Sequence, residues 1–223
     1  MTYNKLFPAE LTQKIQDAGI IAVLEVERVE DAVPVAHALT MGGITVIELA
    51  LRTEAAVPSI REIKQNVPEM IVGAGTIIFP EQVESVIVAG ADFGVSPGCN
   101  SAVIKECIDK HFPFGPGIAT PTELEMALSF GARLIKFFPA EPMGGVSFLK
   151  SMNAPYNYLH VSYIPLGGVS EQNLHEYAQM PQVAAIGGSW IAKRDAITKK
   201  DWSGITARAE AAIKLWKQCT GTV

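Results

Sequence analysis

Short apolar runs alternate with longer amphipathic runs along almost the whole chain, and this alternation limits the possible folds more than any other feature. Short apolar runs bounded by glycine, proline or polar residues are typical of buried strands, and the longer runs repeat apolar residues at helical spacing. The predicted strands are 20–24, 45–51, 71–74, 92–95, 114–118, 134–138, 161–166 and 183–186. The predicted helices are 8–18, 29–41, 54–66, 80–88, 101–110, 121–130, 145–152, one from Ser170 onward, and 202–218.

Strand–helix pairs that repeat without a linker predict an α/β fold, a single (β/α)8 TIM barrel with an extra N-terminal helix, occupying residues 1–223 as one domain. A doubly wound open sheet is the alternative, but such a sheet usually carries a glycine-rich nucleotide fingerprint after its first strand. Here that strand is followed by Glu25-Val26-Glu27-Arg28, so the barrel is favoured. The fifth strand is the least regular, because prolines and glycines at 113–117 leave few ladder hydrogen bonds.

The charge and cysteine content exclude several classes of function. The net charge is −5, with 18 Lys and Arg against 23 Asp and Glu, so no overall basic field attracts nucleic acid or anionic lipid. An anionic substrate must therefore be held by local groups. Cys99, Cys107 and Cys219 lack paired spacing and favour a reducing compartment over a disulfide framework or a zinc site. Without a long apolar segment or a secretory leader, we expect no membrane partner and a cytoplasmic location.

Lys136 lies inside an apolar run, between Ile135 and Phe137. Partial desolvation at such a position disfavours the ammonium form and leaves a neutral amine free to attack a carbonyl carbon. The alternative is a side chain whose stem lies along apolar surface while its head reaches water at the end of the strand. This run alone leaves both interpretations open.

Glu48 is embedded in the second predicted strand in the same way, between Ile47 and Leu49. A carboxylate in an apolar strand needs a partner, and Lys136 on another barrel strand is the obvious one. The pair could exchange protons near neutral pH, or it could be a structural ion pair without chemistry. Both residues lie toward the carboxyl ends of their strands, where TIM barrels place their catalytic groups, and this favours the chemical interpretation.

Gly167-Gly168 and Gly187-Gly188-Ser189 follow the last two predicted strands. Paired glycines let backbone N–H groups approach an anion closely, and Ser189 adds a hydroxyl, so the two loops together favour a phosphate site. Either pair alone is also explained by the tight turns of a barrel. Arg52 and Thr76 suit a small carboxylate, although a solvated arginine and a helix N-cap explain them better when they are taken alone.

Together these groups predict an enzyme that forms an imine between Lys136 and a 2-oxo acid. The imine acts as an electron sink, so the C3–C4 bond can break and leave an enamine, with Glu48 transferring protons. No metal or organic cofactor is required, and the four histidines show no ligand spacing. Two other classes remain open. One is a phosphate-binding barrel isomerase or epimerase, in which Lys136 is only an electrostatic partner, and the other is a non-catalytic sugar-phosphate sensor.

Five motifs are informative as a set: residues 43–53 (GITVIELALRT), 72–76 (VGAGT), 96–98 (SPG), 136–141 (KFFPAE) and 186–190 (IGGSW). They closely resemble those of class I bacterial 2-keto-3-deoxy-6-phosphogluconate and 4-hydroxy-2-oxoglutarate aldolases, and the similarity runs from about residue 8 to 215. The resemblance implies a homotrimer of barrels that releases pyruvate and an aldehyde, either glyceraldehyde 3-phosphate or glyoxylate. It makes Lys136 the Schiff-base residue and Glu48 the general acid and base. The substrate-binding residues that it implies are Arg52 and Thr76 for the pyruvate carboxylate, Pro97, Phe138 and Leu166 along the site, and Gly167, Gly168, Gly188 and Ser189 around the phosphate.

Two positions depart from the pattern of this family. Many relatives carry an arginine at the end of the first strand, where this chain has Glu25, which we expect to repel a phosphate. Relatives that act on the phosphogluconate sugar often have a threonine before the glycines of the seventh strand, where this chain has Leu166. A leucine cannot hydrogen-bond a substrate hydroxyl. We therefore expect loose choice at C4, preference for the galactonate epimer, or a smaller 4-hydroxy-2-oxo acid as substrate.

Overall fold

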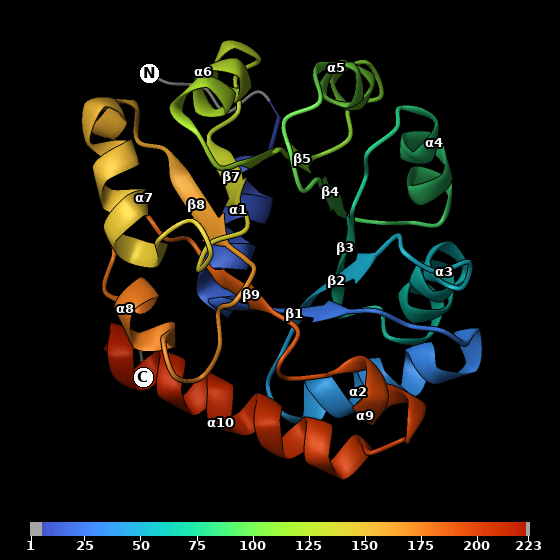
Figure 1. The fold of residues 1–223 in the computed structure, drawn as a ribbon. Helices are drawn as coiled ribbons and strands as arrows, with labels where there is room; N and C mark the ends of the chain where they lie inside the picture. Colours follow the sequence, from blue (N-terminus) through green and yellow to red (C-terminus); the bar gives the residue numbers. More distant parts are fainter. Residues whose placement is uncertain (1–5, 222–223) are drawn as a thin grey trace.

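The structure is a computed structural model that describes residues 6–221. Parallel strands form a ring, and helices surround it (Figure 1). The strands are β1 (Ile20–Leu24), β2 (Val46–Ala50), β3 (Ile71–Gly75), β4 (Phe93–Val95), β5 (Phe114–Gly115), β6 (Gly117–Ile118), β7 (Leu134–Phe137), β8 (Ser162–Pro165) and β9 (Ile186–Gly188). The α-helices are α1 (Ala9–Ala18), α2 (Ala32–Met41), α3 (Ala56–Asn66), α4 (Glu81–Val88), α5 (Ser101–Asp109), α6 (Pro121–Ser129), α7 (Gly145–Asn153), α8 (Leu174–Ala178), α9 (Arg194–Thr198) and α10 (Trp202–Thr220). Residues 6–221 also contain two 3-10 helices, η1 (Val29–Asp31) and η2 (Ala154–Leu159).

The strand order confirms the predicted barrel. One hydrogen-bonded group runs β5-β4-β3-β2-β1-β9 and a second runs β6-β7-β8, and every pairing is parallel. The second group joins the first through a bridge between Tyr163 and Val183, where the Ala184 N–H donates to the Tyr163 carbonyl at 2.9 Å. With β5 and β6 sharing the fifth position, the ring closes at eight strand positions.

The predicted fifth strand is in fact two short strands, because Pro116 interrupts it. Proline has no N–H to donate to a ladder. β5 therefore pairs with β4 before the proline, and β6 pairs with β7 after it. The Pro116 carbonyl still accepts a hydrogen bond of 3.0 Å from the Lys136 N–H, so the break does not open the barrel.

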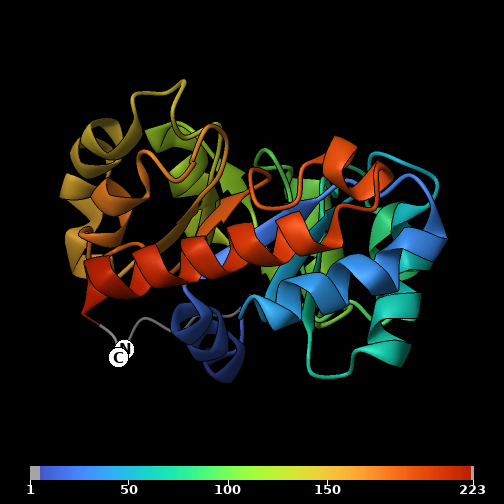
Figure 2. The same ribbon diagram turned by 90° about the horizontal axis from the view of Figure 1, so that it is seen from below.

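Two separate cores hold the barrel. The outer one fills the space between the ring of strands and the helices, and the long α10 packs across α2 and α8 (Figure 2). The inner one fills the barrel itself and includes Phe7 and Ile15, which come from the predicted N-terminal helix α1 and the residues before it. The rings of Phe7 and Phe93 lie 5.8 Å apart at the start of β4. The leading helix thus closes the end of the barrel at which the strands begin.

Some predicted boundaries were wrong near the C-terminus. The helix expected from Ser170 begins at Leu174, because the Asn173 side chain accepts from the Ser170 N–H and donates to the Gly168 carbonyl, which holds residues 170–173 in a turn. The last strand begins at Ile186 rather than at 183, since pairing with β1 starts only there. Helices η2 and α9 were not predicted. Within residues 6–221, no helix is both long and apolar enough to cross a membrane.

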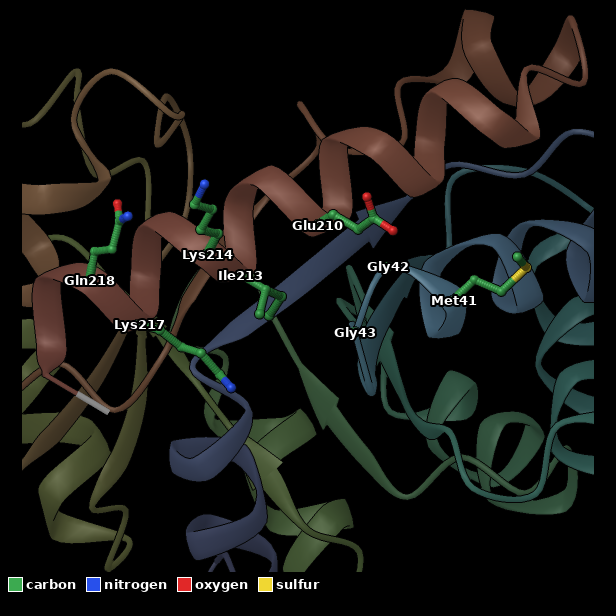
Figure 3. A pocket seen from close by; sticks show the side chains of 8 residues that line it. All are labelled: Met41, Gly42, Gly43, Glu210, Ile213, Lys214, Lys217 and Gln218. Atoms are coloured by element: carbon green, nitrogen blue, oxygen red, sulfur yellow. The ribbon is translucent and has the colours of Figure 1, made fainter. Parts of the chain in front are cut away.

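A shallow hollow of about 580 Å³ lies between α10 and the end of α2 (Figure 3). Gly42 and Gly43 line it just before β2 begins, so it belongs to the N-terminal end of the barrel. Its other side chains are those of an exposed helix surface, such as Lys214 and Lys217. TIM barrels carry their chemistry at the opposite end, and the predicted site residues lie there.

Candidate active site

A buried ion pair crosses the interior of the barrel. Lys136 Nζ donates to Glu48 Oε1 at 3.0 Å, and the two residues are only 5% and 2% exposed. Lys136 comes from β7 and Glu48 from β2, which occupy opposite positions in the ring. Lys136 Nζ also lies 5.5 Å from the centre of the Phe138 ring, a distance at which the ring face attracts a cation. Lys136 therefore does not reach bulk water in the way that the alternative interpretation required.

The two-residue period of a strand explains why these side chains point inward. Leu134 belongs to the inner core and Phe138 packs against it, so Lys136 between them faces the same interior. Val46 is likewise in the inner core, and Glu48 follows it on the same face. Each polar residue sits one layer closer to the carboxyl end of its strand than an apolar one.

Gly75 makes room for the Glu48 carboxylate. Glu48 and Gly73 are partners in the pairing of β2 with β3, and Gly75 is the next inward position on β3. A Cβ atom at Gly75 would come within 1.9 Å of Glu48 Oε1. A glycine is required here because the carboxylate lies directly against the backbone of the neighbouring strand.

One cavity of about 330 Å³ contains the ion pair and opens at the carboxyl ends of the strands. Every residue predicted for the site lines this cavity: Lys136, Glu48, Arg52, Thr76, Pro97, Phe138, Leu166, Gly167, Gly168, Gly188 and Ser189. The structure thus brings together side chains from β2, β3, β7, β8, β9 and the loops that follow them. Sequence reasoning missed Lys193 and Arg194, which line the same cavity. Two adjacent cations shortly after Gly187-Gly188-Ser189 were the signal that could have revealed them.

Thr76 lies in a strained backbone conformation at the mouth. Its φ is +63°, in the left-handed region that a β-branched residue rarely adopts. Such strain costs of order 1–3 kcal/mol and tends to occur at functional sites. Thr76 directly follows β3, so its position next to the cavity is set by a strand that is otherwise regular.

The loop with Gly167 and Gly168 is fixed by the segment that follows β7. Both glycines have positive φ, +92° and +86°, and the Glu141 N–H donates to the Gly167 carbonyl at 2.9 Å. Glu141 in turn accepts a 2.5 Å hydrogen bond from the Tyr177 hydroxyl. Burial, aided by this hydrogen bond, raises the pKa of Tyr177, so the hydroxyl keeps its proton and remains a donor. The glycine loop is therefore held in a defined shape before any ligand binds.

Leu166 forms an apolar wall of the cavity. It is 4% exposed and belongs to the inner core. A Cβ atom at Gly187 would lie 2.7 Å from Leu166 Cγ, so the leucine rests on the bare backbone of β9. Because residue 166 is a leucine, its side chain offers no hydroxyl to a ligand in the cavity.

The cavity mouth carries a cluster of charges. Glu25 Oε2 pairs with Arg52 Nη1 at 3.0 Å, and Glu25 Oε1 pairs with Arg194 Nη1 at 2.8 Å. Arg194 also contacts Glu27. The expected repulsion of an anion by Glu25 is thus offset by two guanidinium groups that the sequence analysis did not connect with it.

Two of the cysteines have raised thiol pKa values, and potential metal ligands are dispersed over residues 6–221. Burial raises the pKa of the Cys99 thiol to about 11 and that of Cys107 to about 12, so both stay protonated at neutral pH. Within residues 6–221, His, Cys, Asp and Glu side chains do not converge in groups of three or more that could hold a metal ion.

Comparison with known proteins decides the family. A family model described as KDPG and KHG aldolase matches residues 5–208 of the chain. The chain belongs to this family. The KDPG and KHG aldolase resemblance inferred from the sequence motifs is therefore confirmed, and the chain is an aldolase rather than a barrel isomerase, an epimerase or a sensor.

Relatives within the family are similar over almost the whole chain. The 2-dehydro-3-deoxy-phosphogluconate aldolase of Dickeya dadantii is 42% identical over 202 residues, which cover 90% of this chain and 94% of that one. The KHG/KDPG aldolase of Escherichia coli K12 is 42% identical over 195 residues, 87% of this chain and 91% of that one. The KDPG aldolase of Legionella pneumophila was solved with pyruvate captured at low pH as a covalent carbinolamine intermediate. It is 37% identical, with a TM-score of 0.86 over 90% of this chain and 97% of that one.

Proposed function

We propose that this aldolase cleaves a 2-keto-3-deoxy-6-phospho sugar acid or a 4-hydroxy-2-oxo acid to pyruvate and an aldehyde, either glyceraldehyde 3-phosphate or glyoxylate. In this proposal Lys136 is the nucleophile and Glu48 transfers the protons. The observation that carries it is the Lys136–Glu48 pair, with 3.0 Å between Nζ and Oε1, buried at the base of the cavity. The relatives named above act on substrates of this class according to their names, which supports the same choice here.

The geometry of the pair supplies the first steps. Glu48 takes a proton from Lys136, and the free Nζ electron pair attacks C2 of the 2-oxo acid to form a carbinolamine. The C2 oxygen takes one proton from the nitrogen and the proton held by Glu48, and it leaves as water, which gives a protonated imine and returns Glu48 to its carboxylate form. A carbinolamine with pyruvate is the species captured in the Legionella aldolase, which supports this order of events.

Carbon–carbon cleavage follows from the same two groups. Glu48, through a water molecule, removes the proton of the C4 hydroxyl, and the electron pair of the broken O–H bond forms the second C–O bond of the aldehyde. The C3–C4 bond breaks, and its electron pair moves toward the iminium nitrogen to give an enamine. Glu48 then gives this proton to C3, and a water molecule hydrolyses the imine, which releases pyruvate and regenerates Lys136. No outside oxidant or reductant is needed.

The remaining cavity residues fit the two ends of such a substrate. Arg52 and the hydroxyl of Thr76 bind the C1 carboxylate, since a guanidinium suits a carboxylate in a bidentate contact. Pro97, Phe138 and Leu166 form the apolar walls. The backbone N–H groups near Gly167, Gly168 and Gly188, with the Ser189 hydroxyl, bind the distal phosphate. All of these residues line the cavity that holds Lys136, which supports their assignment.

Borohydride trapping tests the nucleophile. The protein is incubated with pyruvate, reduced, weighed and digested, and we expect one pyruvate-derived adduct on Lys136. Lys136→Ala should yield no adduct and no turnover, whereas Lys105→Ala, which removes an exposed lysine from α5, should trap like the unmodified protein. The imine mechanism would be contradicted if the unmodified protein gave no stable adduct on Lys136.

Exchange of the pyruvate methyl protons with deuterated water tests Glu48. Enamine formation and reprotonation at C3 cause this exchange, so Glu48→Gln should slow it by about 100-fold or more, within the range of general acid–base contributions. The same variant should still give some adduct with borohydride, because Lys136 is intact. Exchange at the normal rate in Glu48→Gln contradicts the proton-transfer role.

We also propose that the protein is a cytoplasmic homotrimer. Ile78, Phe79 and Val88 are exposed apolar side chains on α4 and the loop before it, and apolar side chains of this kind favour an interface. Cys99, Cys107 and Cys219 are free, in keeping with a reducing compartment. Sedimentation equilibrium should give a mass of three chains, and a monomeric mass at micromolar concentration would contradict the trimer.

A further inference from the structure

The charges at the cavity mouth are arranged around Glu25. Its side chain is 19% exposed, and each carboxylate oxygen accepts from a different arginine, Oε2 from Arg52 and Oε1 from Arg194. Arg194 is 55% exposed and also contacts Glu27. Arg52 comes from the segment after β2 and Arg194 from the start of α9, so Glu25 links two sides of the opening.

The substrate class proposed above has two anionic ends, and the cavity must match both. Among residues 6–221, the cations that line the cavity are Arg52, Lys136, Lys193 and Arg194. Lys136 is paired with Glu48 and faces the reacting carbonyl, and Arg52 is assigned to the C1 carboxylate. Lys193 and Arg194 follow Ser189 closely in the chain, where the loop that contributes to the glycine cradle ends and α9 begins. The positive charge available for the distal end is therefore at the junction of this loop with α9.

Arg194 fits this role better than Lys193. A guanidinium presents several N–H donors in a plane and binds phosphate or carboxylate through two parallel hydrogen bonds, which an ammonium cannot do. Arg194 is also directed toward the cavity by its contact with Glu25, a cavity residue. A phosphate dianion attracts Arg194 more strongly than one carboxylate does, because it carries more charge and more acceptor oxygens.

We propose that Arg194 is the specificity-determining residue for the distal anionic group of the substrate, and that Glu25 is its counter-ion in the free enzyme. The inference rests on the proposed aldolase function. When the substrate binds, Arg194 exchanges the Glu25 carboxylate for the distal phosphate, while Arg52 keeps its contact with Glu25. Glu25 thus does not exclude a phosphate; it holds the arginine that binds one.

The test compares a reaction that involves the distal group with one that does not. The KM for 2-keto-3-deoxy-6-phosphogluconate depends on the distal phosphate, whereas pyruvate methyl-proton exchange involves a ligand without any distal group. Arg194→Met should raise that KM about tenfold, equivalent to about 1.4 kcal/mol, and change kcat and pyruvate exchange less than twofold. Lys199→Met, which removes a cation just after α9 that does not line the cavity, should leave all three values unchanged.

Glu25→Gln separates the counter-ion role from a merely structural one. Removing the charge that competes with the phosphate for Arg194 should lower the KM for the phosphorylated substrate several-fold. In a separate measurement, added salt should raise this KM more in the unmodified protein than in Arg194→Met, because salt screens exposed ion pairs. An increase in KM for Glu25→Gln would overturn the exchange.

The outcomes distinguish this inference from the proposed function. Absence of pyruvate exchange in the unmodified protein means that the imine mechanism itself fails. If pyruvate exchange is normal but the KM for the phosphorylated substrate changes less than twofold in Arg194→Met, the role of Arg194 is overturned. The same holds if Lys199→Met raises this KM equally, or if only Lys193→Met raises it. Normal exchange without any cleavage of the phosphorylated acid also overturns it.

Discussion

Gly75→Ala should greatly lower the activity of the aldolase although neither Lys136 nor Glu48 is replaced. The new Cβ would lie 1.9 Å from Glu48 Oε1 and 2.7 Å from its Cδ, whereas real Cβ contacts are almost never shorter than 3.0 Å. The carboxylate must therefore retreat by about 1.1 Å. The other end of the pair cannot follow freely, because Lys136 projects from a strand on the opposite side of the ring.

A displacement of this size is large for proton transfer. A misplacement of about 1 Å can cost about 100-fold in rate. We expect kcat for pyruvate release to fall by about 100-fold, with the borohydride adduct on Lys136 still forming on long incubation. Overpacking of a buried position costs about 1–3 kcal/mol, so the melting temperature should also fall by several degrees. A coupled assay for pyruvate and a circular dichroism melt measure the two effects.

Gly98→Ala is the matched control. Gly98 also follows a barrel strand, but in the described part of the chain no atom other than those of its two chain neighbours lies within 4 Å of the place where its Cβ would be, and its φ is not positive. Its kcat and melting temperature should stay close to those of the unmodified protein. A folded Gly75→Ala variant that retains kcat within threefold would refute the reasoning, since Glu48 would then function from a displaced position.

Three further predictions concern the mouth, the walls and the thiols. Thr76→Gly and Thr76→Val should both raise the KM for the substrate, because both lose the hydroxyl. The glycine variant should at least keep its free energy of unfolding in urea, since glycine adopts a φ of +63° without strain, and the valine variant should also keep it, because valine is β-branched like the threonine that it replaces. Leu166→Thr should increase the ratio of kcat/KM for the gluconate epimer over the galactonate epimer, from a ratio below about tenfold in the unmodified protein, and an unchanged ratio would contradict the role of Leu166. Native Cys99 and Cys107 should resist iodoacetamide at pH 8, because their pKa values of about 11 and 12 leave almost no thiolate. The unfolded thiols lose their protons near pH 9 while the folded ones keep theirs, so the free energy of unfolding should fall as pH rises from about 9 to 11.

The regular parts of the barrel were predictable because local sequence and tertiary structure agree there. β1 was predicted with its observed bounds, and β7 differed only at one end. In these strands an apolar run is bounded by residues that break it, so the pattern needs no information from other segments. The leading helix was also predicted, but not its function as the closure of the barrel, since contacts such as Phe7 with Phe93 join distant parts of the chain.

Elements that depend on distant partners were predicted less well. Whether Pro116 would bend a strand or divide it depends on how β4 and β7 pair on each side. Helix α9 is short and has little periodicity of its own, so the sequence offered no helical signal there. The interpretation of Glu25 as a repelling charge did not include its ion pairs for the same reason. Its partner Arg194 is 169 residues away in the chain, and no local pattern connects the two.

The reactivity expected of Lys136 is likewise a property of the closed ring rather than of its own strand. The apolar run around Lys136 could bury an amine, but burial alone leaves an expensive unpaired charge. The carboxylate that pairs with this charge is that of Glu48, which lies 88 residues earlier in the chain on a strand across the barrel. It can reach Nζ because Gly75 has no Cβ in the space that the carboxylate occupies. Three strands therefore have to close into one ring before the lysine has both a partner for its proton and a cavity for a keto acid. This is why the lysine-containing run could not by itself distinguish a nucleophile from a solvated side chain, and why the lysine, the glutamate and the glycine should respond to substitution as one unit.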